Sequence, residues 1–169
     1  NRIKNFKIIL FFLLLVVHFL FFMKKILLIR HAKSSWLDTS LADHERPLNK
    51  RGVRSAQFFA ETMKSEFDKV QEVYVSSAKR AQETALELKL NRSKISTHKD
   101  LYTFNCIDLE YFIFSIQSDA QYIQLIGHNP AFTEFVNNHS TIHIDNVPTC
   151  GMVILQWDNA NDWSDVQLE

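Results

Sequence analysis

Short apolar runs alternate along the chain with longer stretches in which apolar residues recur at helical spacing. The run 25–29 reads Lys-Ile-Leu-Leu-Ile, which is typical of a strand buried on both faces of a sheet. Runs at 72–75, 122–126 and 152–157 predict further strands, and 95–101 predicts a weaker one. We therefore expect five strands after the first 22 residues.

Four helices are predicted between these strands. The first covers 49–66 and is capped by Asn49, because the apolar residues that follow keep helical spacing. The others are predicted over 78–89, 105–118 and 130–138. The side chains expected to face the core from these helices include Phe58, Phe59, Ile107, Tyr111, Phe112 and Phe114.

Strands that alternate with helices favour an α/β fold, in which helices cover both faces of a mostly parallel central sheet. A length of 169 residues fits one domain with its own core. We expect this domain at 23–158, after an apolar extension over 1–22 and before a loose polar tail over 159–169.

The extension contains an apolar run, 8–22, that only His18 interrupts. The run resembles the core of a signal peptide or a short membrane anchor. It is shorter than the ~20 residues of a spanning helix, and no small-residue cleavage site follows it. Our hypothesis is that residues before Met23 are a translated or dispensable upstream extension and that the protein is cytoplasmic. The alternative is a protein held at a membrane through 8–22.

The composition argues against several classes of function. Lysine and arginine together number 19, as do aspartate and glutamate, so no excess charge indicates a nucleic-acid partner. Cys106 and Cys150 form no Cys-x-x-Cys pair, and the three glycines leave no nucleotide-binding loop. His139 and His143 stand four residues apart, but 141–147 alternates as a strand would, so we expect no metal site there.

Residues suited to binding an anion follow three of the predicted strands. Arg30 and His31 end the first strand. Arg80 follows the second, and His128 follows the fourth. Ligands of an open parallel sheet bind beyond the carboxyl ends of the strands. Each residue has a purely structural alternative, such as a backbone-bonded histidine or a surface arginine, but their convergence on one edge favours a common crevice.

Two arginines and two histidines suit phosphoryl transfer. The planar guanidinium fork matches phosphate oxygens and stays charged. A neutral imidazole is a good nucleophile toward phosphorus, and a covalent intermediate divides one hard displacement into two easier ones. Catalysis of this reaction depends mainly on positioning the phosphoryl group and on neutralising its oxygens.

Four blocks of the chain resemble the histidine phosphatase superfamily, which is phosphoglycerate mutase-like, and within it the small SixA-type phosphohistidine phosphatases. The blocks are the Arg-His motif at 29–36, the segment 43–52, the Ser-x-x-x-Arg-Ala segment at 76–81 followed by Thr84, and Gly-His-Asn-Pro at 127–130. The resemblance covers about 23–157, nearly everything after the apolar extension. Arg-His alone is a weak signal, but four ordered blocks at strand ends are a specific one.

The resemblance implies a three-layer α/β/α sandwich and a phosphatase in which His31 takes the phosphoryl group from the substrate and passes it to water. It implies that Arg30, Arg80 and His128 complete the phosphate pocket. His128 would be protonated, or would donate a proton to the transferring group. No metal and no organic cofactor are implied.

Three further residues are candidate substrate contacts at the mouth of the crevice, namely Lys33, Arg46 and Asn129. For Lys33 and Arg46 the alternative is a solvated side chain. Arg51 and Arg54 are expected on an exposed helix face.

The sequence shows no motif for a general acid. The carboxylates to consider are Asp43, Glu45, Asp108 and Glu110. An alcohol leaving group needs a proton from such an acid, whereas the imidazole of phosphohistidine leaves without much help. We therefore expect the substrate to be phosphohistidine in a phosphorylated protein, reached through an open mouth. The alternatives are a broad small-molecule phosphomonoesterase on the same site and a phosphate-binding module without turnover.

Overall fold

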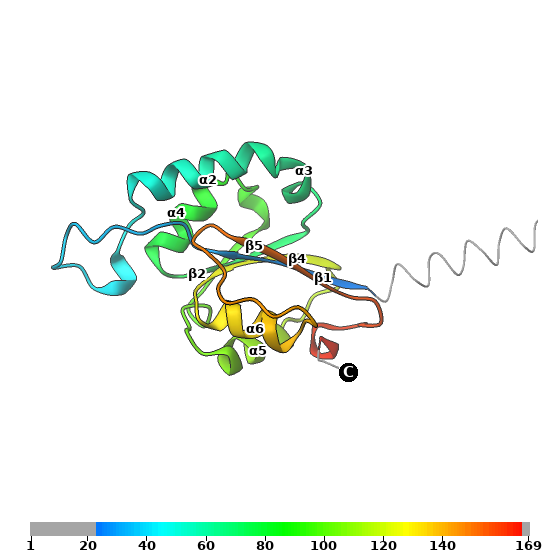
Figure 1. Ribbon diagram of the computed structural model, residues 1–169. Helices are drawn as coiled ribbons and strands as arrows, with labels where there is room; N and C mark the ends of the chain where they lie inside the picture. The colour runs from blue at the N-terminus through cyan, green and yellow to red at the C-terminus, as the bar shows by residue number, and fades with distance from the viewer. Residues whose placement is uncertain (1–22, 167–169) are drawn as a thin grey trace, which may run out of the picture.

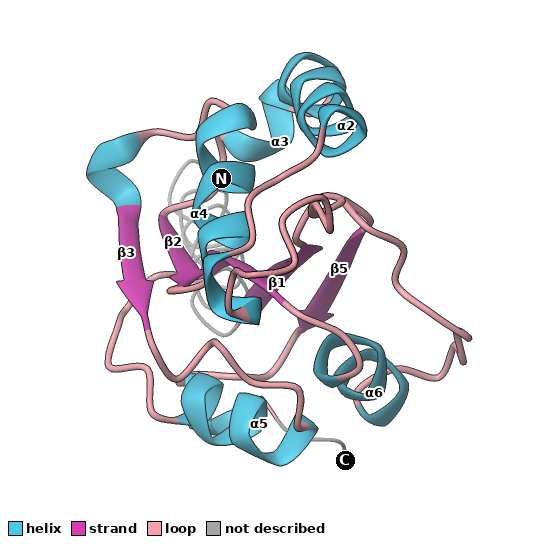
Figure 2. Cartoon of the chain, turned by 90° about the vertical axis from the view of Figure 1, so that its left-hand side faces the viewer, coloured by secondary structure: helices cyan, strands magenta, loops and turns pink. Residues whose placement is uncertain are grey.

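A computed structural model of the chain describes residues 23–166. Its centre is one sheet of five strands in the order β3-β2-β4-β1-β5, with β3 and β5 at the edges (Figure 2). All neighbours are parallel except β5, which runs antiparallel to β1. The strands are β1 (Lys24–Arg30), β2 (Glu72–Ser76), β3 (Ile95–His98), β4 (Tyr122–Gly127) and β5 (Met152–Trp157). The five predicted strands are confirmed, although β3 ends three residues early.

Helices cover both faces of this sheet and give a three-layer α/β/α sandwich (Figure 1). One layer holds α2 (Lys50–Thr62), α3 (Lys64–Phe67) and α4 (Lys79–Glu87). The other layer holds α5 (Cys106–Phe114) and α6 (Ala131–Asn138). The Asn49 side chain accepts a hydrogen bond from the Gly52 amide, so the predicted cap is confirmed. The single helix predicted over 49–66 is divided at Met63 into α2 and α3.

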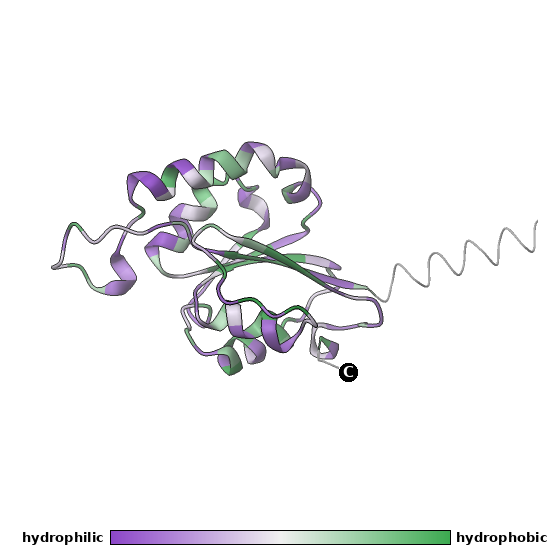
Figure 3. Ribbon diagram, in the orientation of Figure 1, coloured by the Kyte–Doolittle hydropathy of each residue, from purple (hydrophilic) through white to green (hydrophobic). Residues whose placement is uncertain are grey.

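The continuous apolar run of β1 serves two cores. Leu27 and Ile29 pack toward α2 and α4, whereas Ile26 and Leu28 pack toward α5 and α6. All four side chains are fully buried. Apolar positions concentrate along the strands and the facing sides of the helices (Figure 3). Successive side chains of a strand point to opposite faces, and burial on both faces explains why β1 lacks polar alternation.

The face of α5 that packs inward differs from the prediction. Leu109 and Ile113 are buried, whereas Ile107 and Tyr111 are 57% and 71% exposed. Phe112 and Phe114 are partly buried against the same core, as predicted. The helix is apolar on almost every side, so two stripes satisfy helical spacing, and the shape of the sheet surface decides between them.

Phe58 was also expected in the core and is 62% exposed. The inward stripe of α2 follows Gly52, Ala56 and Ala60. Phe58 lies two residues from Ala56, a rotation of ~200°, and therefore points away from the sheet. Phe59 packs against the core at the edge of the stripe, as predicted.

The expected loose polar tail is wrong for residues 160–166. Ala160, Trp163 and Val166 are buried in the core under α5. These apolar residues recur every third position through a 3₁₀ turn, η3 (Trp163–Asp165), which places them on one side of the chain. The packed domain therefore includes residues beyond the predicted boundary at 158.

Three further expectations concern the segment 141–147, the two cysteines and the N-terminal extension. Residues 141–147 form a loop and not the strand-like segment that their alternation suggested. Cys106 and Cys150 are free and buried. Within residues 23–166, no helix combines the length and apolar character needed to cross a membrane. The predictions about the extension at 1–22 lie outside the described residues.

Candidate active site

The two histidines lie side by side because their strands are neighbours. Arg30, the last residue of β1, pairs with Gly127, the last residue of β4. A histidine directly follows each of these strands, and the His31 amide donates to the Gly127 carbonyl across 3.0 Å. The ring centroids of His31 and His128 are 5.0 Å apart. The predicted meeting of the two imidazoles is therefore confirmed.

Arg80 joins these rings from the first turn of α4. Its side chain is 3% exposed. Its Nε donates to Nε2 of His31 across 3.2 Å, and one terminal nitrogen lies 3.4 Å from Nδ1 of His128. Three predicted site residues from three distant segments thus form one buried cluster.

The contacts of His31 define its protonation. Nδ1 lies 2.8 Å from the Ala32 carbonyl, which only accepts, so Nδ1 carries the proton. Nε2 accepts from Arg80 and therefore holds a lone pair. Burial, together with the positive charges of Arg80 and Arg30, lowers the pKa of His31 to about 4. The imidazole is therefore neutral at neutral pH, as a nucleophile requires.

His128 is neutral as well. Burial first, then the neighbouring His31 and Arg80, lower its pKa to about 2. Nδ1 faces the guanidinium of Arg80, so Nε2 carries the proton and donates to Ser76 Oγ across 2.8 Å. The protonated form that the resemblance allowed is disfavoured in this state. Its single N–H is used by Ser76, so the nitrogen that faces the cluster, Nδ1, acts here as an acceptor.

Arg30 and Asn129 lie together beside this cluster. Both donate to the Asn146 side chain and to the Val147 carbonyl. The Nε of Arg30 is buried and has no acceptor among the described residues. A buried guanidinium N–H without a partner is costly, which marks Arg30 as a candidate donor to an anion.

Lys33 and Arg46 do not touch the histidine pair. The Lys33 side chain is exposed. Arg46 is buried, and its three nitrogens donate to the Ser35 carbonyl, to Asp43 and to the Ser34 hydroxyl. Arg46 also stacks on the Trp36 ring at 3.2 Å from the centroid. Its contacts indicate that it holds the segment between β1 and α2, and its solvated alternative is wrong.

Of the four candidate carboxylates, Asp43 is the one that contacts the cluster directly, through Arg80. One oxygen accepts from Arg80 at 2.9 Å and from the Tyr102 hydroxyl at 2.7 Å, and the other accepts from Arg46 at 2.8 Å. The Asp43 carbonyl accepts a further hydrogen bond from Arg80 at 2.6 Å. Burial alone would raise the pKa of Asp43, but the bonds from Tyr102 and Arg80 outweigh it and lower the pKa to about 2. Asp43 is therefore an ionised acceptor.

The other candidate acids have different partners. Glu45 contacts His44, Asp108 accepts from the Thr103 hydroxyl, and Glu110 accepts from His139. None of these bonds reaches His31 or His128. Among the four carboxylates considered, only Asp43 borders the cluster, and it is deprotonated.

Thr84 and Ser76 position the cluster in ways that the sequence did not reveal. Thr84 is fully buried; its hydroxyl accepts from the Ala32 amide and donates to the Arg80 carbonyl. It thus joins the segment of the nucleophile to the helix that carries Arg80. The Ser76 hydroxyl lies 2.8 Å from Nε2 of His128 and so orients that ring, while α4 has no side-chain cap. Both residues belong to a recognised block, which was the available signal.

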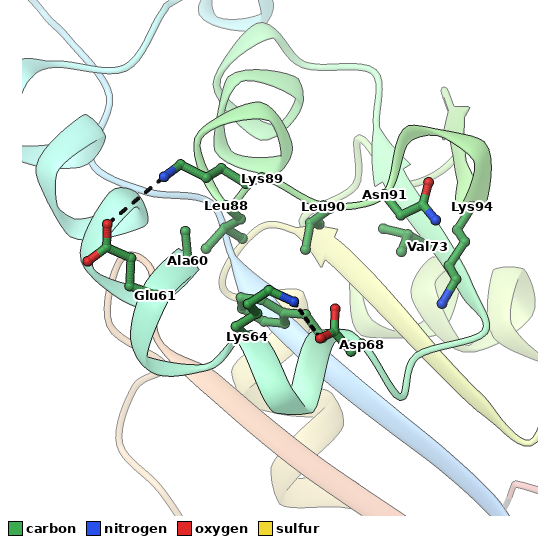
Figure 4. A pocket seen from close by; sticks show the side chains of 11 residues that line it. Ala60, Glu61, Lys64, Asp68, Val73, Leu88, Lys89, Leu90, Asn91 and Lys94 are labelled. Carbon is green, nitrogen blue, oxygen red and sulfur yellow. Dashed lines mark hydrogen bonds and ion pairs between the residues drawn. The ribbon is translucent and has the colours of Figure 1, made fainter.

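A separate cavity of about 500 Å³ lies between the end of α2, α3 and the end of α4 (Figure 4). It is near Val73 at the start of β2, whereas the histidine cluster lies beyond the end of that strand. On its rim Lys64 pairs with Asp68, and Lys89 with Glu61. Four of the charged lining residues are therefore paired with one another, and the remaining one, Lys94, donates to the Val70 carbonyl. The described residues contain no group of three or more side chains suited to holding a metal.

A mostly parallel sheet flanked by helices, with a buried His-Arg-His cluster beyond its strand ends, defines a phosphoglycerate mutase-like protein. The sequence model of the histidine phosphatase superfamily (branch 1) matches residues 26–131, more than half of the chain. The chain belongs to this superfamily, and the membership supports phosphatase activity.

Three similar proteins illustrate the relationship. An uncharacterised chloroplastic protein of Arabidopsis thaliana is 29% identical over 154 residues, which cover 84% of this chain and 70% of that protein. The protein histidine phosphatase SixA, solved with tungstate, superposes with a TM-score of 0.69 at 19% identity, covering 85% of this chain and 91% of that one. Phosphoglycerate mutase of Plasmodium falciparum gives 0.58 at 20% identity, covering 81% and 84%. At these identities the two structures support the fold alone.

Proposed function

We propose that the protein is a phosphatase that works through a phosphorylated His31. The observation that carries this proposal is the lone pair on Nε2 of His31, fixed by the Nδ1 bond to Ala32 and by the contact with Arg80. A buried, neutral imidazole beside a guanidinium is suited to attack on a phosphoryl group. A module that only bound phosphate would need no nucleophile.

The reaction has two steps. In the first, the Arg80 Nε–H releases the Nε2 lone pair of His31, and Nε2 forms a bond to phosphorus while the bond from phosphorus to the leaving group breaks. In the second, water attacks the phosphorus, the bond to Nε2 breaks, and inorganic phosphate leaves with His31 restored. Arg80 and Arg30 would donate to the phosphoryl oxygens, where donors are most effective as charge develops. His128 would join them once its Nδ1 takes up a proton, which the charge of a bound phosphoryl group favours.

The hydrogen bonds of the four candidate carboxylates favour a phosphoramidate substrate. Asp43 is ionised, and the other three candidate carboxylates bond elsewhere. An alkoxide leaves poorly without a proton, but an imidazole that is already protonated on its second nitrogen leaves as a neutral group. We infer that phosphohistidine is the substrate.

Exposed apolar side chains beside the cluster support a protein as the carrier of that phosphohistidine. Trp36 and Leu37 are 69% and 95% exposed on the segment between β1 and α2, which projects beyond the end of the sheet (Figure 1). On the other side, the exposed Phe104 ring lies 5.3 Å from the His128 ring. Exposed apolar side chains that gather at one place are typical of surfaces that contact other proteins. The solved protein histidine phosphatase SixA has the same fold.

That Lys33 and Asn129 contact the phosphorylated protein around the site stays a prediction. For Arg46 we propose a supporting role, because all its nitrogens hold neighbouring parts of the chain.

The test compares turnover of a phosphohistidine peptide with turnover of a series of phosphate esters at equal enzyme. We expect the peptide to be preferred, and we expect ester rates to fall steeply as the leaving alcohol becomes more basic, because no acid protonates it. Preference for alkyl esters would favour the broad phosphomonoesterase instead. Binding of phosphate without turnover of any substrate would favour the non-catalytic module.

A further inference from the structure

We propose that Asp43 competes with phosphoryl groups for Arg80. The Asp43 carboxylate occupies the guanidinium donors that a phosphoryl group needs, and this weakens the binding of free oxyanions. This inference rests on the proposed function of Arg80 as a phosphoryl contact. It concerns the affinity of that same site.

The contacts of Arg80 carry the argument. The Nε–H is directed to His31, one terminal nitrogen donates to the Asp43 carbonyl, and the other donates to the Asp43 carboxylate at 2.9 Å. The last nitrogen is also the one that faces Nδ1 of His128. Carboxylate and phosphate bind a guanidinium through the same planar fork. Asp43 therefore uses the donors that lie next to both histidines.

Asp43 is placed to yield these donors without leaving the site. Its second carboxylate oxygen is held by Arg46, and Tyr102 donates to the oxygen that Arg80 contacts. Arg46 is itself fixed to Ser34 and Ser35, so the counter-charge persists when Arg80 turns to another anion. The Asp43 side chain is 45% exposed, so water can solvate the oxygen that Arg80 releases.

The exchange has a direction set by charge. A phosphoryl dianion offers more charge and one more oxygen than a carboxylate, so it displaces Asp43 when it is positioned at His31. A free phosphate ion must also displace Asp43, but it lacks the additional contacts that the rest of a substrate makes with the protein. Asp43 thus lowers product inhibition and favours substrates that bring additional binding contacts.

The alternative role of Asp43 predicts the opposite result. If the carboxylate only oriented Arg80, its loss would leave the guanidinium misplaced and the site weaker. Replacement of Asp43 by asparagine therefore separates the two roles by the sign of the change in affinity.

The experiment measures the affinity of the purified protein for tungstate and for inorganic phosphate by calorimetry, which needs no turnover. The variants are Asp43→Asn and a matched control, Asp38→Asn, which makes the same change of charge on the same segment. Asp38 is fully exposed and bonds only to Ser40. We expect Asp43→Asn to bind both oxyanions roughly tenfold more tightly, as the loss of one opposing contact predicts, and Asp38→Asn to match the parent.

A second set of variants tests whether the effect acts through Arg80. In an Arg80→Ala background, Asp43→Asn should no longer raise the affinity. Asp43→Ala, which also removes the carboxylate, is the second variant if Asp43→Asn does not fold. Tighter binding of both oxyanions by Asp43→Ala supports the proposal, and unchanged or weaker binding contradicts it.

Weaker binding by Asp43→Asn, or an equal gain in Asp38→Asn, would overturn the assignment. Tighter binding by Asp43→Asn in a protein that forms no phosphorylated histidine would preserve the role of Asp43 and reject the proposed phosphatase chemistry. The two failures are thus distinguishable.

Discussion

Arg80 donates its Nε–H to Nε2 of His31 across 3.2 Å, although the two residues are 49 positions apart in the chain. The contact fixes the nitrogen that would attack phosphorus and places a permanent positive charge beside it. In the proposed reaction the same guanidinium stabilises the oxygens of the transferring group. This relationship makes Arg80 the residue whose loss should affect the rate most, after the nucleophile itself.

Replacement of Arg80 by alanine should lower kcat by several orders of magnitude, since each donor directed at developing charge contributes roughly 10²–10³. Arg80→Lys should recover little, because an ammonium lacks the planar fork. Arg54→Ala, on the exposed face of α2, is the control. Steady-state kinetics on a phosphohistidine peptide measures the change. An Arg80→Ala enzyme within a few-fold of the parent would contradict this assignment.

Thr84→Val should lower the rate of the enzyme without creating a cavity in the core. The change keeps the shape of the side chain but leaves the Ala32 amide without its acceptor, at a cost of about 1–3 kcal/mol. Because Ala32 holds Nδ1 of His31, we expect kcat to fall more than KM changes. Thr62→Val is the matched control, since Thr62 makes the same kind of bond within an exposed helix turn. Equal kinetics for both variants would show that Thr84 does not position the nucleophile.

Gly52→Ala should destabilise the fold next to the site. A Cβ atom on Gly52 would lie 2.3 Å from the Lys33 carbonyl oxygen, so either α2 or the segment after β1 must move. Overpacking of this kind costs about 1–3 kcal/mol. Urea unfolding of Gly52→Ala, compared with Arg51→Ala on the exposed side of the same turn, measures the effect. Equal stabilities would mean that the close approach relaxes freely.

Stability should fall as the pH falls below 6.5. The pKa of His31 is lowered to about 4 and that of His128 to about 2, so the unfolded chain binds more protons in this range. The unfolding free energy therefore rises with pH and is lost on acidification, by roughly 2 kcal/mol for each histidine at pH 5.

Urea unfolding between pH 7 and pH 5 checks this dependence. His128→Asn should flatten it, while His143→Asn, at an exposed position, should leave it unchanged. A parent protein whose stability is constant over this range would show that the two imidazoles are not held neutral by burial.

The meeting of His31, Arg80 and His128 could be predicted from the sequence because parallel strands end at a common edge. The strand order and the pairing of Arg30 with Gly127 come from the structure alone. The sequence predicts a buried first strand from its apolar run, and a mostly parallel sheet from the alternation of strands and helices. These inferences depend on local composition and on topology, both of which a single sequence expresses.

The network around Asp43 could not be predicted in this way. Tyr102 reaches Asp43 from a loop 59 residues away, and no periodic pattern marks a loop residue for such a contact. The inward face of α5 was missed for a related reason: Ile113 and Tyr111 belong to alternative apolar stripes, and only the packed structure distinguishes them.

The central claim is that His31 carries the phosphoryl group during turnover. The most direct measurement is rapid mixing of the enzyme with phosphoramidate, quenching in alkali, where phosphohistidine persists, and mapping of the phosphorylated peptide by mass spectrometry. We predict a transient phosphate on His31 that forms and decays at rates compatible with kcat and is absent from His31→Ala. A phosphorylated protein that persists in His31→Ala, or a phosphate mapped to another residue, would contradict it.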